Sequence, residues 1–109
     1  MKWQIGGDWP VGPHLIPVGT ILSGVARDGE LVEAPIWNGI ALPMPMPINS
    51  TPLDEDAALM MLKWYEPEHW HRIVFGPNID RELIKGRKAA LDHEEQRRRT
   101  ERALAGKRG

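Results

Sequence analysis

The chain has 109 residues, with 14 basic and 15 acidic side chains, five tryptophans and no cysteine. This length fits one small domain with an appendage. The lack of cysteine excludes a disulfide framework, thiol catalysis and cysteine-ligated metal sites. No apolar run approaches the roughly 18 residues of a membrane-spanning helix, and the first residues lack a signal-peptide pattern, so we expect a protein that is not secreted and has no membrane partner.

The near-neutral total conceals two parts of opposite charge. Residues 1–80 carry four basic against ten acidic side chains, a net charge of −6, and residues 81–109 carry ten against five, a net charge of +5. All ten prolines lie at or before Pro77. We therefore expect a small globular domain over residues 1–79, which begins with an irregular arm rich in Trp, Pro and Gly, and a basic helical arm over residues 80–109.

After the irregular arm, the pattern predicts a small antiparallel β-meander. Residues 20–26 and 31–36 have strand-like composition, and the Asp28-Gly29 pair between them suits a type I′ turn. The Asn38-Gly39 pair repeats this signal ten residues later, which predicts about three strands. Residues 42–48 then alternate proline with apolar residues, as is typical of an extended connector that lays its methionines on the core.

The next segment predicts a helix. Ser50 or Thr51 is available as the N-cap, and Pro52 suits the first helical position. We expect the helix to run to about Tyr65 and to end before Pro67. The expected fold is therefore α+β, a small meander packed on this helix, followed by the C-terminal helical arm.

This helix is apolar on two sides. One stripe consists of Leu53, Ala57, Met60 and Trp64. Leu59 and Leu62 point away from the stripe, so either the sheet and the proline-rich connector enclose the helix, or its second side meets another protein.

Titratable side chains are concentrated in residues 66–71, where His69 and His71 flank Trp70. If this stretch is extended, the two histidines share a face and can chelate a metal, whereas on a helix they diverge. Residues 70–75 fit either a strand or a further helical turn. We favour histidines that hydrogen-bond locally. Because the chain also lacks known catalytic motifs, we expect no enzyme, no metal and no cofactor.

The C-terminal part predicts a helix from Arg81 to about Leu104, supported by Glu-to-Arg pairs four residues apart. Four apolar residues can dock it on the body: Ile79, Leu83, Ile84 and Leu91. Between Asp92 and Arg102 there is no large apolar residue, so this half is expected to be solvated.

Tryptophan and arginine, the residue types enriched at interface hot spots, supply most of the candidate contact residues. These candidates are Trp3, Trp9, Leu59, Leu62, Arg97, Arg98, Arg99 and Arg102. With Lys107 and Arg108, the arginines can also neutralise phosphates. Nucleic-acid binding is the weaker interpretation, because glutamates interleave the arginines and no aromatic residue is present to stack on bases.

Several residues resemble, in their order, a group of small proteins encoded in tailed-phage and prophage regions. They are Trp9, Leu15-Ile16-Pro17, Gly19-Thr20, Trp37-Asn38-Gly39, the proline-rich run from Leu42 to Asn49, Leu53-Asp54 and Trp64-Tyr65. The resemblance covers roughly residues 9–77 and implies a virion part, such as a capsid decoration, stabilising or neck protein, or else a regulator or inhibitor of host defence.

We therefore expect a non-enzymatic phage structural or accessory protein, in the virion or the host cytoplasm. Its expected partners are capsid or neck proteins, or another copy of itself. The alternative is a small nucleic-acid-associated or regulatory protein that uses the arginine-rich helix.

Overall fold

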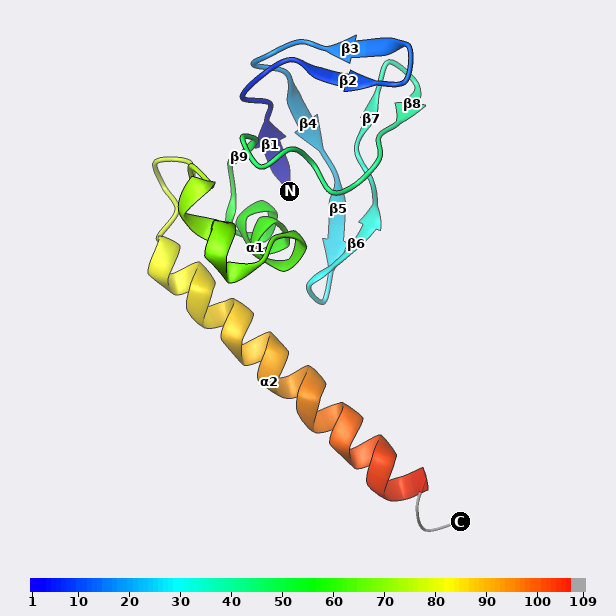
Figure 1. Ribbon diagram of the computed structural model, residues 1–109, viewed down its shortest axis with the longest axis vertical. Coiled ribbons are helices and arrows are strands. Elements are labelled where there is room, and N and C mark those ends of the chain that lie inside the picture. Colours follow the sequence, from blue (N-terminus) through cyan, green and yellow to red (C-terminus); the bar gives the residue numbers. More distant parts are fainter. Residues whose placement is uncertain (107–109) are drawn as a thin grey trace.

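The computed structural model describes residues 1–106, with side chains through Ala103. Within these residues it contains short antiparallel strands, two α-helices and one 3₁₀ helix (Figure 1). The strands gather at one end of the molecule, α1 packs beneath them, and α2 passes α1 and extends away from the body. The expectation of an α+β fold is confirmed.

The sheet that packs on α1 joins segments far apart in the sequence. Its order is β4 (Ile21–Ser23), β1 (Lys2–Gln4) and β9 (Thr51–Pro52). Trp3 lies opposite Leu22 on one side and Pro52 on the other. The expected irregular N-terminal arm is thus wrong for its first residues, because both edges of β1 find partners that the local sequence does not indicate.

The remaining strands form three two-stranded hairpins. They are β2 (Trp9–Val11) with β3 (His14–Ile16), β5 (Val25–Arg27) with β6 (Glu30–Glu33), and β7 (Ile36–Trp37) with β8 (Ile40–Ala41). Asp28 and Gly29 have φ angles of 54° and 76°, which confirms the first predicted turn. Asn38 and Gly39, at 48° and 79°, confirm the second. The strands do not form one continuous meander, because the buried Pro35 has no N–H to continue the ladder between β6 and β7.

Helix α1 (Glu55–Trp64) begins later than expected. Its N-cap is Asp54, whose side chain accepts a hydrogen bond from the backbone N–H of Ala57. The predicted caps, Ser50 and Thr51, are wrong, because Thr51 and Pro52 are drawn into β9 by pairing with β1. The predicted end is confirmed, since Tyr65 is the C-cap.

The body of the protein encloses α1 on both sides. All six residues from Ala57 to Leu62 are buried. The core around them includes Trp3, Ile16, Leu22, Leu42, Met46, Ile73 and Ile84. The proline-rich connector places Met46 fully in this core and Met44 at its edge, as expected. Of the two alternatives for α1, enclosure within the chain is therefore the one observed.

Two helical segments complete the chain. The 3₁₀ helix η1 (Pro67–Arg72) shows that residues 70–72 continue as a helical turn rather than a strand. Helix α2 (Arg81–Gly106) follows, and the Asp80 carboxylate caps it by accepting a hydrogen bond from the N–H of Glu82 at 3.0 Å.

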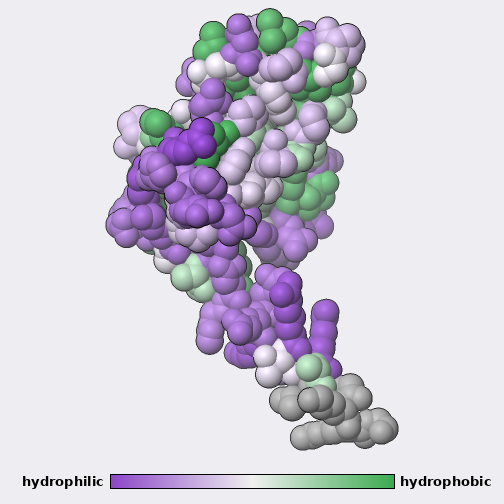
Figure 2. Space-filling model, viewed as in Figure 1, coloured by the Kyte–Doolittle hydropathy of each residue, from purple (hydrophilic) through white to green (hydrophobic). Residues whose placement is uncertain are grey.

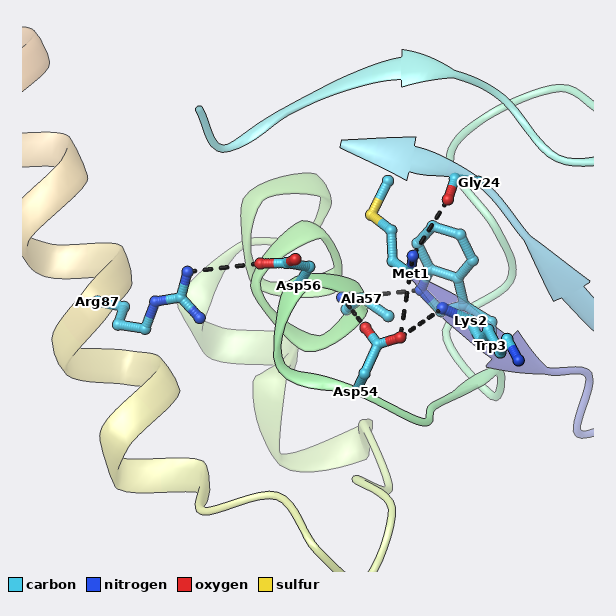
Figure 3. Close-up of polar contacts among 8 residues, drawn as sticks. All are labelled: Met1, Lys2, Trp3, Gly24, Asp54, Asp56, Ala57 and Arg87. Atoms are coloured by element: carbon cyan, nitrogen blue, oxygen red, sulfur yellow. Dashed lines mark hydrogen bonds and ion pairs between the residues drawn. The ribbon is translucent and has the colours of Figure 1, made fainter. Parts of the chain in front are cut away.

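A cluster of polar contacts joins the chain's first residues to α1 (Figure 3). Oδ2 of Asp54 accepts the N–H of Lys2 at 2.9 Å and lies 3.9 Å from the amino group of Met1. That amino group donates to the carbonyl oxygen of Gly24 at 3.1 Å, so β1, α1 and the end of β4 meet here. One carboxylate therefore caps α1 and also aligns β1 on it.

Candidate functional site

The first half of α2 is docked on the body by apolar and charged contacts. Ile84 is fully buried, and the guanidinium of Arg81 donates to the carbonyl of Ile73 at 2.9 Å. Arg87 lies 3.3 Å from a carboxylate oxygen of Glu55 and 3.5 Å from one of Asp56, at the start of α1. Part of the positive charge of α2 is thus matched within the chain, at the end of α1 that bears acidic side chains.

The second half of α2 leaves the body. We call residues 92–103 the projecting segment; apart from the half-buried Glu94, its side chains are exposed. The projecting segment carries hydrophilic side chains, whereas apolar side chains gather on the strand-bearing part of the visible face (Figure 2). At 1.5 Å per residue, this segment is about 18 Å long.

Ion pairs along the projecting segment stabilise it as a helix. Arg98 lies 2.8 Å from Glu94, and Arg99 lies 2.8 Å from Glu95. Each pair has its acidic residue four positions before the basic one, the favourable order on a helix, worth about 0.3–0.5 kcal/mol per pair. The predicted pairs are confirmed. The segment is helical without burying an apolar face.

A groove begins where α2 contacts the β5–β6 hairpin at Leu91 and runs between the hairpin and the following turns of α2. Its volume is about 370 Å³, and its body side carries Asp28, Glu30 and Lys63. Its helix side runs from Leu91 to Arg102 and includes the Glu94–Arg98 and Glu95–Arg99 pairs. We call this the hairpin groove. It is lined mainly by charged side chains and is open, so it fits a charged polypeptide surface better than an apolar small molecule.

Three of the predicted contact residues belong to the core. Trp3 is fully buried, donates its indole N–H to the carbonyl of Ala57 at 3.3 Å, and stacks on Trp64 with ring centroids 5.6 Å apart. Leu59 and Leu62 are each 1% exposed. The expectation that these three bind a partner is corrected, because their surfaces are covered by this chain.

The other predicted contact residues are accessible to different degrees. Trp9 is half-buried in β2 and packs against the core. The four arginines, Arg97, Arg98, Arg99 and Arg102, are all exposed. Arg98, Arg99 and Arg102 line the hairpin groove, while Arg97 does not and lies 4.0 Å from Glu101. Lys107 and Arg108 lie outside the described residues.

Sequence reasoning missed the acidic side of the hairpin groove. The sequence pattern assigns Asp28 only to a turn and indicates no role for Glu30. One signal was available for the helix side, because the spacing of three or four residues that joins Ile84 to Leu91 continues through Glu95, Arg98 and Arg102. The face of α2 that docks on the body therefore becomes, beyond Leu91, the face that lines the groove.

The histidines of η1 lie at the surface, with Nε2 of His69 3.5 Å from Glu68. His69 is half-buried and His71 exposed. In a helical segment, side chains two residues apart diverge, which removes the extended geometry that chelation requires. Among the residues that the structure describes, no group of three or more His, Asp or Glu side chains is placed to hold a metal ion.

The burial of Tyr65, whose hydroxyl donates to the carbonyl of Met46, raises the pKa of the Tyr65 phenol, and the nearby Arg72 partly opposes this shift.

In the described part of the chain, neither α-helix combines the length and apolar character needed to cross a membrane. No family model matches the sequence, and comparison with curated proteins and solved structures gives no match.

Proposed function

We propose that this chain is a non-enzymatic structural or accessory subunit of a phage particle, of the capsid-decoration, stabilising or neck type. In this proposal the subunit joins a larger protein assembly through α2. The observation that carries it is the projecting segment, which is held as a helix by its own ion pairs while burying almost none of its surface. A helix built in this way presents three turns of side chains to a partner without disturbing the core.

The charge pattern of α2 favours a protein partner over nucleic acid. Arg98 and Arg99 are already paired with Glu94 and Glu95, and Asp28 and Glu30 face them across the hairpin groove. A phosphate backbone would meet these carboxylates as well as the arginines, which weakens the electrostatic attraction that drives such binding. Mixed charges of both signs are common on protein interfaces, where they set register and specificity.

The experiment that tests the proposal is incorporation into particles. Particles are purified from the phage or lysogen that encodes the chain, washed at moderate salt, and analysed by quantitative mass spectrometry. We expect the chain at a fixed ratio to the major capsid protein. Replacing the four arginines with alanine, Arg97→Ala, Arg98→Ala, Arg99→Ala and Arg102→Ala, removes the ion pairs but places the strongest helix former at each position, and is expected to reduce incorporation at least tenfold.

A control variant removes two positive charges from the docked half of α2. Lys85→Ala with Lys88→Ala is expected to leave incorporation within twofold of the original chain, because neither residue belongs to the projecting segment. Absence of the chain from washed particles would contradict the proposal. Binding of the chain to duplex DNA at physiological salt, lost in the alanine variant, would favour the nucleic-acid alternative instead.

A further inference from the structure

The order of charges along the projecting segment is not random. Acidic residues predominate before Gln96, at Asp92, Glu94 and Glu95, and basic residues predominate after it, at Arg97, Arg98, Arg99 and Arg102, with Glu101 as the exception. The sign of the charge therefore inverts at Gln96. Such an order complements a copy of itself that runs in the opposite direction, and repels a copy that runs in the same direction.

The residues of the hairpin groove make this complementarity specific. Suppose that two copies of α2 cross antiparallel about a two-fold axis between Gln96 and Arg97. The residue numbers of two positions that face each other then add up to 193. Glu94 then faces Arg99 of the other copy, and Glu95 faces Arg98. All four residues line the groove, so they already lie on one face of α2. Symmetry repeats both contacts, which gives four opposite-charge pairs in one interface. The same register sets Asp92 level with Glu101 of the other copy, a like-charge contact that is also repeated, although Glu101 does not line the groove.

The same register accounts for the acidic side of the groove. It places Arg102 of the other copy opposite Leu91, where the hairpin tip contacts α2. Asp28 and Glu30 line this side of the groove together with Lys63, whose ammonium group donates to the carbonyl of Gly29. The incoming arginine would lay its aliphatic stem on Leu91, which is half-buried, and direct its guanidinium to the two carboxylates.

We infer that α2 of a second copy of this chain lies along the hairpin groove and inserts side chains into it, in antiparallel orientation, with the two-fold axis between Gln96 and Arg97. The inference rests on the proposed role of α2 as a contact element and names its partner. Each arginine has five N–H donors, so Arg98 retains its own Glu94 while it binds Glu95 of the other copy. Because the interface is charged and short, the pairing is weak, reversible and sensitive to salt.

Charge exchange between two variants tests the pairing. Variant A carries Glu94→Arg and Glu95→Arg, and variant B carries Arg98→Glu and Arg99→Glu. Each variant gives the four paired positions of α2 a single sign of charge and leaves the rest of the groove unchanged, so it is expected to be monomeric by analytical ultracentrifugation, where the original chain self-associates. An equimolar mixture of A and B restores opposite charges at every pair, so we expect a heterodimer at least as stable as the original homodimer.

A matched control separates this effect from net charge and folding. Lys2→Glu with Lys85→Glu changes the net charge as variant B does, but neither residue lines the groove or belongs to the projecting segment, so self-association is expected to stay within about threefold. Circular dichroism is used to check that α2 remains helical in each variant. We expect the dissociation constant of the original chain to rise about tenfold between 50 and 500 mM salt.

Orientation is measured with spin labels, which is straightforward because the chain has no native cysteine. In the antiparallel pair, labels on Gln96→Cys lie near the axis, while labels on Ala103→Cys are separated by about 20 Å more along the helices. A parallel pair would give equal separations at both positions, which would overturn the inference.

Other outcomes also decide against the pairing. A monomer at all concentrations up to 0.5 mM in low salt, or failure of A and B to associate, overturns it. So does association with duplex DNA that displaces the homodimer. The pairing and the proposed function fail separately: a monomeric chain that still enters particles contradicts only the pairing, and a homodimer that is absent from particles contradicts only the proposed function.

Discussion

Leu91 of α2 contacts the tip of the β5–β6 hairpin, because a Cβ atom on Gly29 would lie 3.1 Å from its Cδ1. Gly29 has a φ of 76°, so the tight turn brings the backbone of the hairpin directly against the leucine side chain. Leu91 is also the last large apolar residue before the projecting segment. This contact determines where α2 leaves the body and where the hairpin groove begins.

Truncation of this leucine tests how firmly α2 is docked. We expect Leu91→Ala to lower the free energy of unfolding by about 1–2 kcal/mol, less than for a fully buried leucine because Leu91 is only half-buried. Urea denaturation followed by tryptophan fluorescence measures the change. Leu83→Ala is the control, since Leu83 is 51% exposed, and its effect is expected to stay within about 0.5 kcal/mol. Equal effects of the two substitutions would show that the hairpin contact is not a docking point.

Asp54 provides a second test, because it serves α1 and β1 together. Its Oδ1 accepts the N–H of Ala57 and its Oδ2 accepts the N–H of Lys2, both at 2.9 Å. We expect Asp54→Ala to destabilise the fold by about 2 kcal/mol, at the upper end of the range for N-cap losses, since a contact of β1 is lost as well. Asp56→Ala, which removes an exposed carboxylate from the same turn, is expected to cost less than about 1 kcal/mol. A smaller loss for Asp54→Ala than for Asp56→Ala would argue against the double role of Asp54.

Features of the fold that depend on neighbouring residues were predictable from the sequence. The Asp28-Gly29 and Asn38-Gly39 turns follow from the positive φ that these residue pairs adopt at low cost. The misplaced start of α1 has a different cause. Thr51 pairs with Gln4, a residue more than forty positions away, and this pairing extends the chain where local signals favour a helix.

The candidate site was predictable only where it depends on neighbouring residues in the sequence. Exposure of Arg98 and Arg99 follows from the lack of large apolar residues around them in the sequence. The burial of Trp3 depends on the long-range pairing of β1 on both sides. The hairpin groove depends on where the β5–β6 tip lies against α2, which no local pattern specifies.

Ser50 is a third point where stability is expected to change. Its side chain is fully buried, and among the described residues its hydroxyl has no hydrogen-bond partner. Because an unsatisfied buried hydroxyl is unfavourable, we expect Ser50→Ala to raise the free energy of unfolding by about 1 kcal/mol. The comparison is Thr20→Val, which removes a hydroxyl that donates to the carbonyl of Pro17 at 2.7 Å and is expected to lower stability. Destabilisation by Ser50→Ala would mean that the hydroxyl is satisfied in solution.

Burial of Tyr65 makes stability depend on pH in the alkaline range. Its raised pKa means that the folded protein holds the phenolic proton more tightly than the unfolded chain, whose pKa is about 10. The resulting stabilisation is fully present below pH about 10 and is lost as pH rises through the folded pKa. Tyr65 is the single tyrosine of the chain, so the rise of phenolate absorbance near 295 nm during titration reports on it directly.

The substitution Tyr65→Phe separates this ionisation from other alkaline effects. It removes the hydrogen bond to the Met46 carbonyl, so we expect a loss of about 1 kcal/mol near pH 7. Above pH 10 the variant should lose stability less steeply than the original chain, because it has no phenol to ionise. Urea denaturation at intervals from pH 8 to pH 11 measures both slopes. If the two slopes are the same, the alkaline loss arises from other groups, such as the lysines, and the burial of Tyr65 does not contribute to it.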